Sequence, residues 1–287
     1  MNLMSDDPSA RPVALVTGAS RGIGKASALA LAEAGFDVAV AARTLAEGTG
    51  HDDARDAPLP GSLEETGAGI EERGGRALLV QIDLHDRASL VAAADRVVEE
   101  WGCIDVLVNN AVDTGPGSMD LFADTDLDTF ERKIQANYLS QLALIKAVLP
   151  GMLARGSGRI VNITSASGTM DPTAPAGQGG WGLAYSASKG AFHRVAGVLG
   201  VEVGSEGVFA FNVEPGMILT ERMVENQKAL GLEDKYPAAP PSVPASVVTW
   251  LGSMPAEKAA ELNGTTFTAQ RTAWQEGLHE DWRPARS

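Results

Sequence analysis

Short runs of β-branched and apolar residues alternate along this chain with longer stretches that have the period of an amphipathic helix. Leu90, Ala94 and Val97, for example, recur at helical spacing between two of these runs. Such alternation is typical of βαβ units built around a parallel sheet. The predicted strands are residues 13–17, 37–41, 77–82, 106–109, 159–164, 208–213 and 265–268. Seven strands of this kind predict an α/β fold with one doubly wound, seven-stranded parallel sheet flanked by helices.

Two stretches interrupt the alternation. Residues 47–61 are rich in Gly, Pro and Asp, and residues 170–182 read MDPTAPAGQGGWG, so both are predicted to be loops inserted near these positions. No linker separates two halves of the chain. We therefore predict a single domain at 11–287, preceded by a disordered leader at 1–10.

The first predicted strand runs into a glycine-rich turn, residues 17–24, with the sequence TGASRGIG. An alanine-rich helical stretch follows, so backbone amides at its N-terminus would face an incoming pyrophosphate. The glycines would let phosphate groups approach the backbone closely. A glycine-rich turn is weak evidence by itself, but strand, turn and helix in this order favour a dinucleotide site.

The end of the second predicted strand bears on the choice of cofactor. Folds that prefer NAD place an acidic residue there, whereas this chain has Ala42 followed by Arg43. Without that carboxylate a 2′-phosphate is not repelled, and Arg43 and Arg21 are able to donate charge-assisted hydrogen bonds to it. We predict that NADP(H) is favoured over NAD(H). The alternative is that both arginines are solvated, which leaves the preference open.

Tyr185 and Lys189 lie four residues apart in YSASK, so their side chains share one face of a helix. A phenol with a pKa of about 10 is a poor base at neutral pH, and a nearby ammonium favours its phenolate form. The pair therefore predicts an acid/base.

Ser165 ends the fifth predicted strand, at the edge of the sheet where ligands bind. Its hydroxyl would hydrogen-bond either a substrate oxygen or only the loop backbone. Ser167 is an alternative candidate for the same catalytic role.

These motifs resemble those of the short-chain dehydrogenase/reductase family. Residues 17–24 resemble its TGxxxGxG turn, 185–189 its YxxxK motif, and 215–220 its PGxxxT segment. Residues 109–111 resemble its NNAG turn, except that Val112 replaces the glycine. The resemblance implies a Rossmann-like fold. It also implies an NAD(P)(H)-dependent oxidoreductase that moves a hydride between nicotinamide and a ketone or secondary alcohol.

The resemblance also implies roles for individual residues. Lys189 would hold the nicotinamide ribose as well as assist Tyr185, and Asn137 would hold a water that relays protons to Lys189. The alternative for Asn137 is a core amide whose hydrogen bonds are satisfied by nearby groups. Asp83 would contact the adenine, cap a helix, or do both. The predicted catalytic residues are Asn137, Ser165, Tyr185 and Lys189. The predicted cofactor-binding residues are Gly18, Ser20, Arg21, Gly22, Ile23, Gly24, Arg43, Asp83, Leu84, Asn110, Ala111, Tyr185, Lys189, Pro215, Gly216, Ile218 and Thr220.

Charge and composition exclude several other partners. A formal charge of −14 disfavours nucleic acids and anionic membranes, and the longest apolar runs are far shorter than the roughly 20 residues that cross a bilayer. The four histidines lack metal-ligand spacing, so no metal is predicted. One cysteine and a first segment without an apolar stretch predict a cytoplasmic protein.

Other functions remain open at this point. A sensor or regulator that binds NADP(H) without turnover is one alternative. A lyase or epimerase that uses the nicotinamide transiently is another, which the short segment after residue 268 disfavours. The substrate is predicted to be a small neutral carbonyl or alcohol, because the loops expected around it carry no basic cluster. The resemblance also implies a homo-oligomer, either a dimer or a homotetramer.

Overall fold

Seven parallel strands form the central sheet of the computed structural model, which describes residues 11–53, 56–230 and 238–283. The order across the sheet is β5-β2-β1-β6-β7-β8-β9. The strands are β1 Val13–Thr17, β2 Asp37–Ala42, β5 Ala77–Gln81, β6 Val106–Asn109, β7 Gly158–Ile163, β8 Val208–Glu214 and β9 Thr266–Thr268. Each predicted strand is confirmed, with ends that differ by at most one residue. The predicted leader at 1–10 lies outside the described residues.

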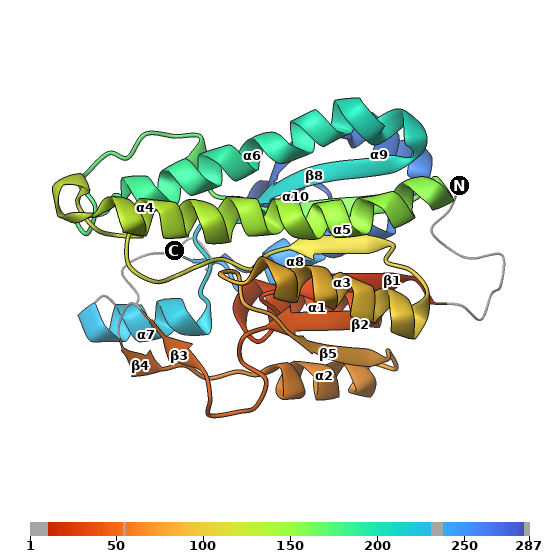
Figure 1. Cartoon of the computed structure of the whole chain (residues 1–287), viewed down its shortest axis with the longest axis horizontal. Helices are drawn as coiled ribbons and strands as arrows, with labels where there is room; N and C mark the ends of the chain where they lie inside the picture. The colour runs from red at the N-terminus through yellow and green to blue at the C-terminus, as the bar shows by residue number, and fades with distance from the viewer. Residues whose placement is uncertain (1–10, 54–55, 231–237, 284–287) are drawn as a thin grey trace.

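Helices cover both faces of the sheet (Figure 1). On one face lie α1 (Gly22–Glu33), α2 (Leu63–Glu72) and α8 (Ser242–Ser253), and on the other lie α3 (Arg87–Trp101), α5 (Ser140–Arg155) and α6 (Leu183–Val203). The remaining helices are α4 (Leu127–Ile134), α7 (Glu221–Leu230), α9 (Ala256–Leu262) and α10 (Ala269–Gln275). This is the predicted doubly wound arrangement, in which strand order reverses between β1 and β6.

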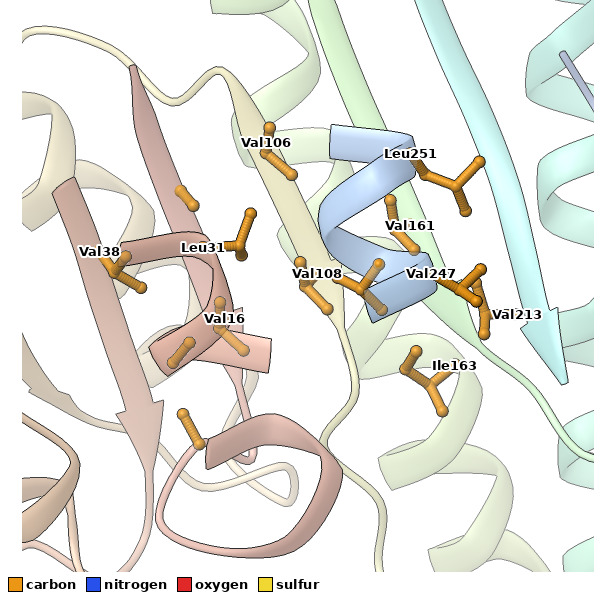
Figure 2. Packing of buried hydrophobic residues seen from close by; sticks show 14 of the residues in the cluster. Val16, Leu31, Val38, Val106, Val108, Val161, Ile163, Val213, Val247 and Leu251 are labelled. Atoms are coloured by element: carbon orange, nitrogen blue, oxygen red, sulfur yellow. The ribbon is translucent and has the colours of Figure 1, made fainter. Parts of the chain in front are cut away.

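The alternation of side chains along each strand supplies a separate core to each face. In β1, Val16 packs in the cluster that contains Leu31 and Leu251, whereas Leu15 packs in the cluster that contains Leu90. Figure 2 shows the first of these clusters between the sheet and the helices. Because successive residues of a strand point to opposite faces, a strand covered on both sides is apolar along most of its length.

Both predicted loops follow the carboxyl end of a strand. Residues 47–61, after β2, contain a short antiparallel pair, β3 (His51–Asp52) and β4 (Ala57–Pro58), which the sequence did not indicate. Residues 170–182, after β7, contain one isolated bridge between Ala176 and Gly180. Parallel strands all end at one edge of the sheet, so both segments lie at the edge where α/β folds bind ligands.

Candidate active site

The turn between β1 and α1 has the shape that a phosphate site requires. Gly18 and Gly22 have φ angles of 67° and 57°, which a side chain would strain. A side chain at Gly24 would collide with the carbonyl oxygen of Gly18, so α1 begins tightly against the turn. The Asn110 amide donates to Thr17 O (2.9 Å) and Gly18 O (3.3 Å), which fixes the turn from the neighbouring strand.

A cavity of about 240 Å³ opens at this turn, where β1, β2, β5 and β6 end. The predicted residues that line it are Gly18, Ser20, Arg21, Gly22, Ile23, Arg43, Asp83, Leu84, Asn110, Ala111 and Thr220. Lining residues outside the predicted set are Ala42, Thr44, His51, Leu59, Ile82, His85, Val112, Asp113, Thr114 and Arg222. His51, Leu59 and Arg222 come from 47–61 and α7, for which no motif in the sequence indicated contact with this site.

Asp83 and Leu84 follow β5 at the rim of the cavity. The Asp83 carboxylate accepts a hydrogen bond from the backbone of His85 (2.8 Å), and Asp86, not Asp83, caps α3 by accepting from Ala88 N (3.0 Å). Helix capping therefore does not explain Asp83. Its carboxylate holds the bend that turns the chain along the cavity.

The two arginines predicted to meet a 2′-phosphate contact residues 47–61. Arg21 donates to Pro60 O (2.7 Å) and Gly61 O (3.0 Å), and burial lowers its pKa. Arg43 forms an ion pair of 2.7 Å with Asp53. Both guanidinium groups thus lie at the cavity with protein partners.

The segment after β8 reaches the same cavity. The Glu214 carboxylate accepts from Gly216 N (2.8 Å), and Gly216 has a φ of 75°, so Pro215 and Gly216 form a tight turn. Ile218 is buried and forms a bridge with Ala239, which leaves Thr220 facing the cavity at the start of α7.

Tyr185 lies in the first turn of α6, beside Ser165 at the end of β7. Burial raises the pKa of Tyr185, and its hydrogen bond with Ser165 acts in the opposite direction. Ser167 is buried and donates to Ser165 Oγ (2.9 Å). The structure therefore brings Ser165, rather than Ser167, to the tyrosine hydroxyl. A side chain at Gly168 would clash with the backbone of Lys189, so this glycine lets the turn after β7 pack against α6.

Lys189 lies one helical turn beyond Tyr185 and is buried. Its ammonium donates to the carbonyl oxygen of Ile163, in β7, at 2.9 Å. Burial lowers the pKa of Lys189 to about 8. A charged amine in such surroundings costs free energy, which suggests a purpose other than stability.

Asn137 lies in a π-helical turn (Gln135–Leu139) that joins α4 to α5. Its amide oxygen accepts from Asp113 N (2.7 Å), and its amide nitrogen donates to Ser188 Oγ (3.0 Å) in α6. The local partners expected of a core amide are thus present. The water relay to Lys189 stays a prediction.

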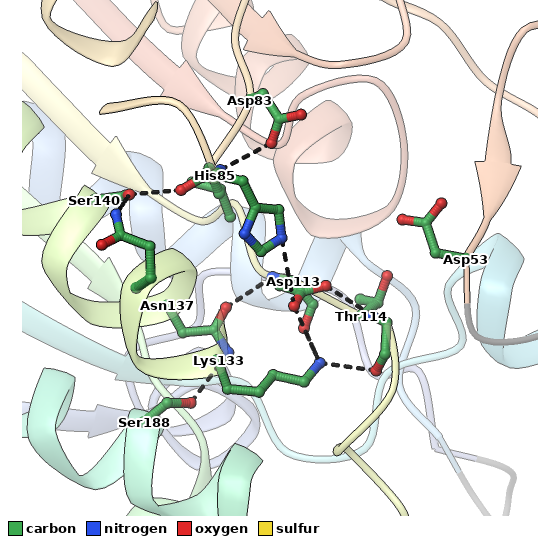
Figure 3. Close-up of polar contacts among 12 residues, drawn as sticks. Asp53, Asp83, His85, Asp113, Thr114, Lys133, Asn137, Ser140 and Ser188 are labelled. Atoms are coloured by element: carbon green, nitrogen blue, oxygen red, sulfur yellow. Dashed lines mark hydrogen bonds and ion pairs between the residues drawn. The ribbon is translucent and has the colours of Figure 1, made fainter. Parts of the chain in front are cut away.

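Lys133 is fully buried one turn before Asn137, at a position that no motif in the sequence indicated. Its ammonium donates to Asp113 O, Gly115 O and Ser118 Oγ at 2.8–2.9 Å. Figure 3 shows Lys133 below the Asp113 side chain, with His85 on the opposite side. Burial lowers the pKa of Lys133, and the Asp113 carboxylate, 3.5 Å away, acts in the opposite direction. Lys133 thus holds the loop after β6, in which Val112 replaces the expected glycine.

The family model described as short chain dehydrogenase matches residues 12–231 of this chain. The chain belongs to the short-chain dehydrogenase/reductase family. It is therefore an oxidoreductase with the Rossmann-like fold of that family, which binds a nicotinamide dinucleotide.

Individual relatives agree with this assignment. The chain is 35% identical over 258 residues to a 3-oxoacyl-[acyl-carrier-protein] reductase from Synechocystis sp., covering 89% of this chain and 94% of that protein. A crystal structure of a short-chain type dehydrogenase/reductase from Mycobacterium marinum is 28% identical, with a TM-score of 0.74, and covers 92% and 95% of the two chains. A 3-oxoacyl-[acyl-carrier protein] reductase from Brucella melitensis is 26% identical, with a TM-score of 0.72 and coverage of 91% and 96%.

Within 11–53, 56–230 and 238–283, no three His, Cys, Asp or Glu side chains are grouped so that they could hold a metal ion. In the same part of the chain, no helix combines the length and the apolar character needed to cross a membrane.

Glu221 occupies the position at which a pyrophosphate is expected. Its carboxylate, from the start of α7, accepts a hydrogen bond of 2.9 Å from Gly22 N in the first turn of α1. An anionic ligand needs the same donor, so Glu221→Gln is expected to lower the Kd for NADH or NADPH roughly fivefold, corresponding to about 1 kcal/mol. A fluorescence titration measures this. Glu225→Gln, which removes a carboxylate paired with Lys228 on the same helix, is the matched control. Equal effects of the two changes would contradict the prediction.

Proposed function

We propose that this family member transfers a hydride between a nicotinamide cofactor and a ketone or secondary alcohol, with Tyr185 as the acid/base. One observation carries the proposal. The Tyr185 hydroxyl contacts Ser165, and the buried ammonium of Lys189 follows one turn later, at the sheet edge that also holds the cavity. A proton donor, a polarising hydroxyl and a cation are the groups that carbonyl reduction requires.

The cavity residues fit a dinucleotide. The glycine turn and the first amides of α1 suit a pyrophosphate, and Thr220 lies directly beside Gly22 at the cavity, because a Cβ at Gly22 would come within 3.1 Å of the Thr220 side chain. When bound, the cofactor supplies the hydride in reduction and accepts it in oxidation. Tyr185 would donate a proton to the carbonyl oxygen, Ser165 would hydrogen-bond that oxygen, and the Lys189 charge would favour the phenolate left behind.

The preference for NADP(H) over NAD(H) is part of the proposal. Support comes from Ala42, which leaves no carboxylate at the end of β2, and from Arg43, which lines the cavity next to it. A guanidinium at this position can bind a 2′-phosphate in a bidentate manner.

The substrate is proposed to be a small neutral carbonyl or alcohol. Residues 170–182 and the segment that begins at Met217 follow the carboxyl ends of β7 and β8, and they contain the apolar residues Trp181, Met217 and Met223. The two relatives named as 3-oxoacyl-[acyl-carrier-protein] reductases make a 3-oxoacyl thioester the second class to examine.

The test measures binding before turnover. NADH and NADPH are titrated into the protein, and the better cofactor is then used with a panel of ketones, alcohols and one 3-oxoacyl thioester. Binding followed by turnover supports the proposal. Binding without turnover across the whole panel would favour the sensor alternative, and no binding would contradict the assignment of the cavity.

We also propose a homo-oligomer, either a dimer or a tetramer. Val198 and Val201 on α6 are 48% and 87% exposed, and apolar side chains exposed on a helix often pack against another subunit. Sedimentation velocity is expected to give a mass of at least twice the 29.8 kDa of one chain. A monomer across the micromolar range would contradict this. The cytoplasmic location stays a prediction.

A further inference from the structure

The segment after β2 forms part of the wall of the proposed cofactor cavity. His51 and Leu59 line the cavity, and Leu59 N donates to Gly50 O (2.9 Å), which closes the short β3–β4 pair. This segment therefore brings its own side chains to the end of the cavity formed by β2. In a dinucleotide fold that end receives the adenosine ribose.

The segment holds the two nearby arginines in different ways. Arg21 donates to two backbone oxygens, Pro60 O and Gly61 O, and also to Thr44 Oγ1 (3.3 Å), so the fold itself occupies its guanidinium. Arg43 forms an ion pair with the Asp53 carboxylate at 2.7 Å, without a backbone acceptor for its guanidinium among the described residues. The Arg43 side chain is 51% exposed, so an incoming ligand can reach it.

Asp53 is placed to oppose a second anion at Arg43. Its Cβ lies beside Gly115, in the loop after β6, so Arg43 reaches from the end of β2 toward the opposite wall of the cavity. Figure 3 shows the Asp53 carboxylate on the side of Thr114, which also lines the cavity. A 2′-phosphate bound by Arg43 would have to displace this carboxylate or lie next to it. A 2′-hydroxyl would do neither.

We propose that Asp53 determines how strongly the site discriminates between NADP(H) and NAD(H), by competing with the 2′-phosphate for Arg43. This inference rests on the proposed function only in taking the cavity to bind a nicotinamide dinucleotide. The acidic group that other dinucleotide folds carry at the end of the second strand is here supplied by the inserted segment. Asp53 thereby weakens the NADP(H) preference that Ala42 and Arg43 would otherwise produce.

The experiment uses adenosine 2′,5′-bisphosphate and adenosine 5′-monophosphate as probes, because they differ only in the 2′-phosphate. Their Kd values are measured by calorimetry for the wild type, Asp53→Asn and Asp56→Asn. Asp56→Asn is the matched control, since its carboxylate is 98% exposed and pairs with His51 rather than with an arginine. Asp53→Asn is expected to raise the preference for the bisphosphate about tenfold. Asp56→Asn is expected to leave it within about twofold.

A double-mutant cycle with Arg43→Gln tests whether the two residues act as a pair. In the Arg43→Gln background, Asp53→Asn is expected to change the preference much less than it does in the wild type. An unchanged preference in Asp53→Asn, equal shifts in the two Asn variants, or additive effects with Arg43→Gln would overturn the inference. The probes carry no nicotinamide, so these results are independent of turnover. If the protein binds both probes but reduces no carbonyl, only the proposed function is contradicted, and the inference about Asp53 is unaffected.

Discussion

Replacing Tyr185 with Phe is expected to lower kcat for carbonyl reduction roughly 10²–10⁴-fold, because a positioned acid/base contributes about that much to a rate. The Kd for the nicotinamide cofactor is expected to stay within about twofold, since the change removes a group needed in the transition state and leaves the ground state nearly intact. Steady-state kinetics with the best substrate of the panel and a fluorescence titration with the cofactor measure the two quantities.

The structure explains why this change is selective. Phe keeps the aromatic ring in the first turn of α6 and removes only the hydroxyl that contacts Ser165. Burial raises the pKa of that hydroxyl, which keeps it protonated and ready to donate to a carbonyl oxygen. The Ser165 hydrogen bond opposes this shift, because a hydrogen bond to the tyrosine oxygen favours the phenolate.

Tyr138→Phe is the matched control for this prediction. Tyr138 lies in the π-helical turn and packs against the apolar core, and its substitution removes the same atom from a different place. We expect its kcat to remain close to that of the wild type. Comparable losses in both variants would mean that the effect is structural, and full activity in Tyr185→Phe would remove Tyr185 from the chemical step.

Most of the fold could be predicted because it depends on local pattern. Strand β1 is apolar from Val13 to Val16, as is typical of a strand covered on both faces, and the helical period of Leu90, Ala94 and Val97 marked α3. The glycine turn and the YSASK segment could also be recognised from residues that are close together in the sequence. Residues that are four apart, such as Tyr185 and Lys189, share a helix face wherever that helix lies.

The parts of the site that escaped prediction depend on partners far apart in the chain. Glu221 reaches Gly22 across 199 residues, and Arg21 reaches Pro60 across 39, so neither contact leaves a periodic signal in the sequence. The π-helical turn that contains Asn137 was not predicted either, because its period differs from that of an α-helix. The position of Lys133 could have been noticed in the sequence, because it lies one helical turn before Asn137. If Asn137 is a buried amide, a lysine on the same side of the helix is also buried and needs hydrogen-bond acceptors for its ammonium.

Lys189 provides the second large effect, because its burial acts on activity and stability in opposite directions. A pKa of about 8, against 10.5 for an ordinary lysine, means that the folded protein holds this charge at a cost of about 3 kcal/mol at neutral pH. Lys189→Met removes that cost and loses the hydrogen bond to Ile163 O, which contributes about 1 kcal/mol. We therefore expect the variant to lose activity roughly 10²-fold or more and to gain about 2 kcal/mol in free energy of unfolding.

The pH dependence distinguishes this explanation from a general packing effect. Below about pH 8 Lys189 is charged in both the folded and the unfolded protein, so the wild type bears the full cost. Between about pH 8 and 10.5 the folded form releases the proton and the unfolded form keeps it, so the cost declines as the pH rises. The advantage of Lys189→Met, measured by denaturant unfolding without cofactor, is therefore expected to be largest near pH 7 and to shrink toward pH 10. The control Lys146→Met, at an exposed position on α5, should show no such trend. A Lys189→Met advantage that stays constant with pH would mean that the ammonium is not the source of the cost, and that the lysine is retained for packing and not for its charge.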